Sequence, residues 1–79
     1  LNLAFNKIKL IPCEIYELYN LKELNLQFNV IQMIEKKIEK LINLEILNLH
    51  CNEIYSILFN IDNFKKLKYF TIHENPVQC

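Results

Sequence analysis

Two histidines and three cysteines are the side chains of this sequence best suited to metal binding or nucleophilic chemistry. His50 and His73 are 23 residues apart, and two imidazoles brought together could share a metal ion or form a pH-sensitive contact. A zinc site normally has at least three protein ligands, however, and Cys13, Cys51 and Cys79 show no C-x-x-C spacing. We therefore predict neither a metal site nor a bound cofactor.

The other polar residues do not predict an active site. Cys51 follows His50, but adjacent side chains on a strand point to opposite faces, so this histidine could not activate the thiol. Ser56 and Asp62 fall on connecting segments, and the sequence contains no Gly from which a phosphate-binding loop could be built. We expect no catalytic residue in this chain and do not predict that it is an enzyme.

The spacing of the two histidines belongs to a repeat that runs through the whole sequence. Asparagines recur every 23 residues, each within the same apolar frame LxxLxLxxNxI. The repeated asparagines are Asn6, Asn29, Asn52 and Asn75. The copies read LNLAFNKI (1–8, cut at its start), LKELNLQFNVI (21–31), LEILNLHCNEI (44–54) and LKYFTIHENPV (67–77). Three intervals in one register make a chance match very improbable.

This register predicts one repeat array over residues 1–79. The expected units are a partial repeat 1–20, the repeats 21–43 and 44–66, and a partial repeat 67–79.

Each copy combines two periodicities. In the second copy Leu24 and Leu26 alternate with polar residues, which predicts a strand with one apolar face. Ile34, Ile38 and Leu41 follow at i, i+4 and i+7, the stripe of a short helix. The equivalent stripes are Ile11, Ile15 and Leu18 in the first copy and Ile57, Ile61 and Phe64 in the third. Stacked units would pair their strands into a parallel sheet.

The pattern resembles the leucine-rich-repeat family in its intracellular 23-residue form. The segment IPCEIYELYNLKELNLQFNVI (11–31) is similar to the LPxxIxxLxxLxxLxLxxNxL repeat of Ras-suppressor and Scribble-like proteins, although proline occupies this repeat position only at Pro12. The resemblance implies an α/β fold, a right-handed solenoid with a short parallel sheet on its concave face and short helices or 3-10 turns on its convex face. Since the sequence shows no polar cap at either end, we expect a fragment of a longer protein.

The repeated asparagines are expected to satisfy buried backbone groups rather than to bind a ligand. An Asn amide offers both a donor and an acceptor, so one in each copy could bridge to the next copy and form a ladder. Because the sequence has no Gly, turns that need a positive φ are also expected on Asn. Phe5, Phe28 and Cys51 precede three of these asparagines, and we expect an aromatic stack that fills the turn there.

Strand side chains that point away from the core would collect on the concave face. Their mixture of amides, imidazoles and apolar groups with few charges is typical of protein interfaces, so we predict that a protein partner binds there. The predicted binding residues are Glu23, Asn25, Gln27, Ile46, Asn48, His50, Tyr69, Thr71 and His73. The alternative that some of them are only solvated or form local cross-strand pairs stays open.

The charge balance gives no generic target. Nine lysines balance nine acidic residues and the sequence has no Arg, so neither nucleic acid nor an anionic membrane is favoured. No apolar run approaches the length of a membrane span, and the odd cysteine set indicates a reducing, cytoplasmic compartment. We expect a protein-interaction scaffold or regulatory module. The alternative is the substrate-recognition segment of a larger signalling enzyme, a kinase or a ubiquitin ligase, and the oligomeric state stays open.

Overall fold

The computed structural model describes residues 1–77, and its regular elements are short. The described residues form five strands and three 3-10 helices. The strands are β1 (Glu23–Asn25), β2 (Met33–Ile34), β3 (Ile46–Asn48), β4 (Ser56–Ile57) and β5 (Tyr69–Thr71). The 3-10 helices are η1 (Cys13–Glu17), η2 (Lys36–Lys40) and η3 (Ile61–Asn63). Gln78 and Cys79, and with them the predicted end of the last repeat, lie outside the described residues.

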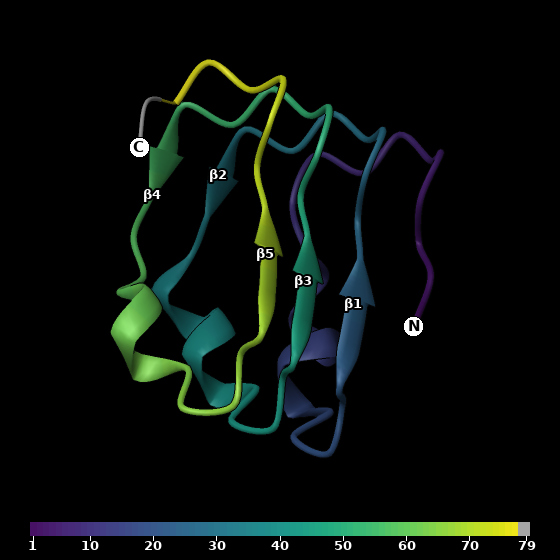
Figure 1. Cartoon of the computed structure of the whole chain (residues 1–79). Helices are drawn as coiled ribbons and strands as arrows, with labels where there is room; N and C mark the ends of the chain where they lie inside the picture. The colour runs from purple at the N-terminus through teal and green to yellow at the C-terminus, as the bar shows by residue number, and fades with distance from the viewer. Residues whose placement is uncertain (78–79) are drawn as a thin grey trace.

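Strands from successive copies lie side by side and run in the same direction (Figure 1). β1, β3 and β5 form one parallel sheet, in which Leu24 pairs with Leu47 and Leu47 with Phe70. A second parallel pair, β2 and β4, places Ile34 opposite Ile57. Each paired residue lies 23 positions further along the chain. The prediction of short parallel strands joined by short helical returns is therefore confirmed.

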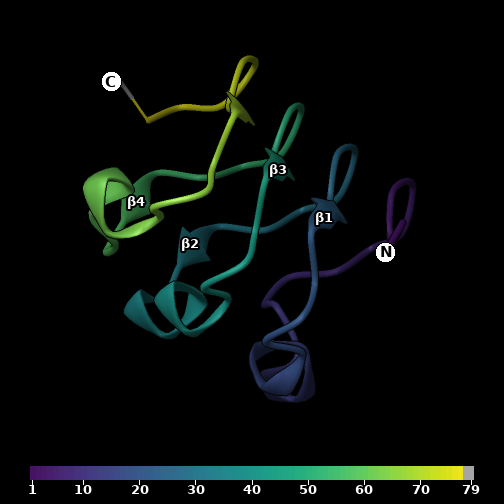
Figure 2. The same cartoon turned by 60° about the horizontal axis from the view of Figure 1, so that its bottom comes forward.

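The 3-10 helices lie on the side of the molecule away from β1, β3 and β5 (Figure 2). The stripe from Ile34 to Leu41 was expected to form one helix, but Ile34 lies in β2 and the helix η2 covers only Lys36–Lys40. The helical prediction was wrong in extent because Ile34 pairs with Ile57 of the next copy. The few residues left in the return form the tighter 3-10 turn that is common in short connections.

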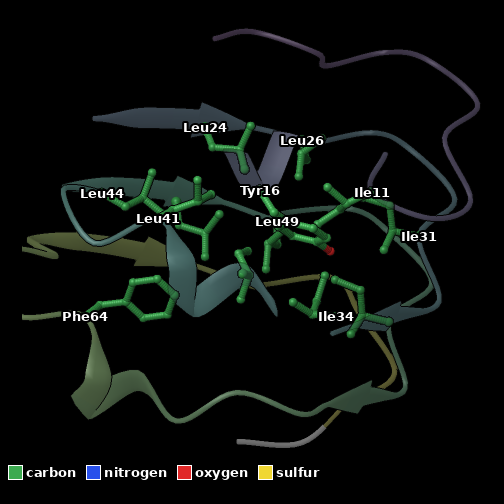
Figure 3. Packing of buried hydrophobic residues seen from close by; sticks show 13 residues of the cluster. Ile11, Tyr16, Leu24, Leu26, Ile31, Ile34, Leu41, Leu44, Leu49 and Phe64 are labelled. Carbon is green, nitrogen blue, oxygen red and sulfur yellow. The ribbon is translucent and has the colours of Figure 1, made fainter. Parts of the chain in front are cut away.

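The core is one apolar cluster that continues from copy to copy (Figure 3). Leu24, Leu26, Leu47 and Leu49 are fully buried, because each strand lies between the copies on either side. Burying each of these side chains contributes about 1.5–3 kcal/mol to stability. The core is therefore most complete in the second and third copies.

The first and last copies bury the same repeat positions less well. Ile61 is 42% exposed, although its equivalent Ile38 is fully buried. Leu18 is 44% exposed, although its equivalent Leu41 is fully buried. Repeat equivalence therefore overestimates burial at the two ends, since each of these residues has a described copy on one side only.

Tyr16 is a core residue that the repeat pattern did not indicate. It is 2% exposed, whereas the equivalent positions hold the polar residues Glu39 and Asp62. Its hydroxyl donates a hydrogen bond to Glu35 Oε1 at 3.4 Å. Burial, together with the nearby Glu35 carboxylate, raises the pKa of the Tyr16 hydroxyl well above its ordinary value. The ring thus helps to join the first copy to the second.

The turn after each strand contains one residue in the left-handed region, and none of these is Asn. The residues are Phe5, Phe28, Cys51 and Glu74, with φ of 59°, 57°, 56° and 58°. The expectation that Asn would take these positions was wrong. Each asparagine amide is hydrogen-bonded to the backbone around it, so the reversal falls on the preceding residue. A residue with a Cβ pays about 1–2 kcal/mol in this conformation.

Candidate functional site

The side chains that alternate with the core leucines form a surface that we call the open face. Strand register places them in rows that run across β1, β3 and β5. The rows are Glu23–Ile46–Tyr69, Asn25–Asn48–Thr71 and, just beyond the strands, Gln27–His50–His73. Figure 2 shows this sheet on the side opposite the 3-10 helices. The structure thus brings the nine predicted binding residues onto one surface.

The repeated asparagines bond inward and hold the copies together. The Asn52 Nδ2 donates to the Leu26 carbonyl of the preceding copy at 2.9 Å, and its Oδ1 accepts the Ile31 N–H at 3.0 Å. The same pair of bonds joins Asn29 to Leu3 and Ile8, and Asn75 to Leu49 and Ile54. Asn29 and Asn52 are 5% and 8% exposed, so their amides replace water for backbone groups inside the molecule.

Asn6 differs from the other three, because its Nδ2 donates only within its own copy, to the carbonyls of Leu3 and Ala4 at 3.0 and 3.1 Å. No described residue lies on the side where a preceding copy would be. Asn6 therefore provides a natural comparison for what the inter-copy bonds contribute.

A second column of asparagines on the open face is structural, which the sequence reasoning missed. The Oδ1 atoms of Asn2, Asn25 and Asn48 each accept the N–H two residues further on, at 3.0, 3.1 and 3.0 Å. These bonds satisfy backbone donors at the point where each strand ends. The signal was present in the sequence, because these asparagines are also 23 residues apart.

The centre of the open face is further connected by side-chain hydrogen bonds. Thr71 Oγ1 donates to Asn48 Oδ1 at 2.9 Å, and Asn48 Nδ2 donates to Gln27 Oε1 at 3.4 Å. Much of the hydrogen-bonding capacity of the Asn48 side chain is thus used within the sheet. A partner would gain more from the flanks of the face, where Tyr69 is 65% exposed.

One flank carries a continuous line of rings, which we call the aromatic row: Phe5, Phe28, His50 and His73. Phe5 and Phe28 are stacked with their centroids 4.7 Å apart and their planes at 9°. The Phe28–His50 and His50–His73 pairs are each 6.0 Å apart and nearly perpendicular. Phe5 and Phe28 are 72% and 43% exposed, so the prediction that their stack fills the turn was wrong. A positive φ turns these rings outward, and the row continues through His50 instead of Cys51.

The two histidines are adjacent, but the described part of the chain gives them no third ligand. Within residues 1–77 no three His, Cys, Asp or Glu side chains lie close enough together to hold a metal ion. The nearly perpendicular contact between the rings of His50 and His73 is instead typical of aromatic packing.

Charged side chains are concentrated away from the open face, where Glu23 is the one ionisable carboxylate of the nine binding residues. On the other surfaces, acidic and basic groups pair between copies. Lys68 Nζ lies 3.5 Å from Glu45 Oε1, and Lys40 Nζ lies 3.7 Å from Glu17 Oε1. These exposed pairs contribute little to stability, but they leave the open face nearly uncharged.

Glu39 connects two successive returns through its carboxylate. Its Oε2 accepts the Asn60 N–H at 2.9 Å, and its Oε1 accepts Asn63 Nδ2 at 3.0 Å and Lys36 Nζ at 3.1 Å. The bond from the Asn60 N–H, supported by Lys36 and Asn63, lowers the pKa of Glu39 from its ordinary value of 4.5. Its equivalent in the first copy is the buried Tyr16, so each return is joined to the next by a different side chain.

Comparisons with protein families, with curated proteins and with solved structures found no match to this chain. Among residues 1–77, none of the helices is long and apolar enough to cross a membrane.

Proposed function

We propose that this chain is a leucine-rich-repeat array that binds a protein partner through the open face. In this proposal successive copies are coils of a right-handed solenoid, and the open face is its concave surface. Support comes from the constant 23-residue offset of the paired strands and from asparagines that join each copy to the one before. A parallel strand reached by a crossover connection in the same sheet is right-handed in nearly all proteins.

One observation carries the binding proposal: nine side chains spaced along the sequence lie together on one sheet surface whose opposite side is fully buried. The surface combines exposed Tyr69, half-buried Ile46 and two imidazoles. Aromatic residues are enriched and charged residues depleted in the cores of protein interfaces. The strands are short and tied to their neighbours, so a partner would meet a largely preformed surface, which lowers the entropy cost of binding.

The proposed location is the cytoplasm. Cys13 and Cys51 carry free thiols, and free thiols persist in a reducing compartment.

The test compares open-face variants in a quantitative binding assay. Ile46→Ala and a double variant, His50→Ala with His73→Ala, are expected to weaken retention of a partner captured by the wild-type chain. Circular dichroism and urea unfolding verify that each variant is folded. If both folded variants retain the partner as the wild type does, the open face is not the binding surface.

A further inference from the structure

A small hollow lies on the open face beside β1. Its volume is about 180 Å³, and it is lined by Leu1, Asn2, Glu23, Asn25, Ile46 and Asn48. It is thus walled by a carboxylate and amides on one hand and by aliphatic side chains on the other. A ligand group that fills it needs several hydrogen-bond donors, a positive charge and an apolar stem.

The Glu23 carboxylate is the charged group of this hollow. Glu23 is exposed, and its carboxylate has no ion pair or hydrogen bond with any residue in the described range 1–77. The Leu1 ammonium donates to the main-chain carbonyl of Glu23 at 2.9 Å, and it is not paired with the carboxylate. The carboxylates of Glu39, Glu17 and Glu45, away from the open face, are each within 4 Å of a lysine.

The amide oxygens next to Glu23 are held in place and keep acceptor capacity. Asn2 Oδ1 accepts the Ala4 N–H at 3.0 Å, and Asn25 Oδ1 accepts the Gln27 N–H at 3.1 Å. An amide oxygen has two lone pairs, so each can accept a second hydrogen bond. These acceptors require no reorganisation when a donor arrives, because backbone bonds already fix the side chains.

We infer that this hollow is a subsite for an arginine side chain of a protein partner, an inference that rests on the proposed function. A guanidinium carries five N–H donors in a plane and can bond a carboxylate and amide oxygens together. Its aliphatic stem lies against Ile46, which follows Glu23 across the sheet. A lysine ammonium has three donors and is more strongly hydrated, so it gains less from a half-apolar hollow. A calcium ion normally takes six to eight oxygen ligands, often from several carboxylates, and this hollow has one carboxylate.

The probe that tests this subsite is N-acetyl-L-arginine methylamide, titrated into the chain while backbone amide NMR shifts are recorded. Its neutral near-isostere N-acetyl-L-citrulline methylamide and the corresponding lysine derivative serve as comparisons. We expect saturable shifts at Asn25 and Ile46 with the arginine probe and weaker effects with the other two. Glu23→Gln should lower the affinity for the arginine probe about three- to fivefold, the range for an exposed ion pair.

The matched control is Glu53→Gln. Glu53 is also exposed and lies in the turn after Asn52, so this substitution makes the same change in net charge outside the hollow. Equal loss in both variants would show a general charge effect and overturn the subsite, as would citrulline or lysine binding as tightly as arginine. A protein partner that binds wild type and Glu23→Gln equally would also overturn the subsite while leaving the proposed function in place.

Discussion

Asn52 and Ile31 are joined by a hydrogen bond of 3.0 Å that spans 21 residues of sequence. The Asn52 Oδ1 accepts the Ile31 N–H inside the molecule, while its Nδ2 donates to the carbonyl of Leu26. One side chain thus replaces water for two backbone groups of the preceding copy. Because the arrangement recurs at Asn29 and Asn75, it is the polar counterpart of the continuous leucine core.

The first prediction concerns this bond. Asn52→Ala is expected to destabilise the chain by about 2–4 kcal/mol, because it leaves two buried backbone groups without partners at about 1–3 kcal/mol each. Asn6→Ala removes bonds within one copy only and should cost less than about 1 kcal/mol. Urea unfolding of the two variants gives the comparison. Similar losses for both would show that the inter-copy bonds are not what makes the repeated asparagine important.

The second prediction concerns Tyr16. Tyr16→Ala is expected to cost about 3–5 kcal/mol, the range for deleting a buried aromatic ring. Tyr16→Phe retains the ring and loses only the 3.4 Å contact with Glu35, so it should cost less than about 1.5 kcal/mol. Thermal unfolding of both variants separates the two contributions. A Phe variant as unstable as the Ala variant would assign the stabilisation to the hydroxyl instead of the ring.

The third prediction concerns pH. The folded chain lowers the pKa of Glu39 below its ordinary value of 4.5, so the folded state favours the ionised carboxylate. The resulting stabilisation is complete at pH values above 4.5 and is lost as the pH falls through the lowered pKa of the folded state. Glu39→Gln should flatten this part of the pH profile of unfolding. Glu14→Gln, on the same side of the molecule, is the control and should leave the acid limb unchanged.

The fourth prediction concerns the left-handed residues. Glu74 has φ of 58° and an exposed side chain, so Glu74→Gly relieves backbone strain without removing core contacts. We expect a net gain of about 0.5–1 kcal/mol after the greater flexibility of glycine in the unfolded chain is included. Glu53→Gly, at an exposed position outside the left-handed region, should lose a similar amount. Destabilisation of equal size in both would mean that the positive φ carries no strain.

The parallel strands and their register could be predicted from the sequence because the chain repeats itself. Once Leu24, Leu47 and Phe70 are recognised as equivalent, pairing at a constant offset follows. The extent of the helical return could not be predicted, because Ile34 satisfies both a helical stripe and the strand pairing with Ile57. Only the position of the neighbouring copy decides between these two.

The candidate face was predictable as a set of residues but not as a set of contacts. Strand alternation identifies which side Asn25 and Asn48 occupy, yet it does not show that their amide oxygens are used by the backbone. Likewise the column Phe5–Phe28–Cys51 is visible in the sequence, but the turn that moves the row from Phe28 to His50 is a matter of backbone conformation. Burial at the ends, as for Ile61, depends on what lies beside the copy.

Two tyrosines offer the most direct measurement of the central claim. Tyr69 on the open face and Tyr55 on another surface are 65% and 62% exposed, so Tyr69→Ala and Tyr55→Ala remove the same exposed ring from different surfaces. We predict that, by calorimetry or surface plasmon resonance, Tyr69→Ala weakens binding of the captured protein partner about tenfold, the loss typical of an interface aromatic. Tyr55→Ala should bind like the wild type. Unchanged binding in Tyr69→Ala together with a loss in Tyr55→Ala would contradict the assignment of the open face as the binding surface.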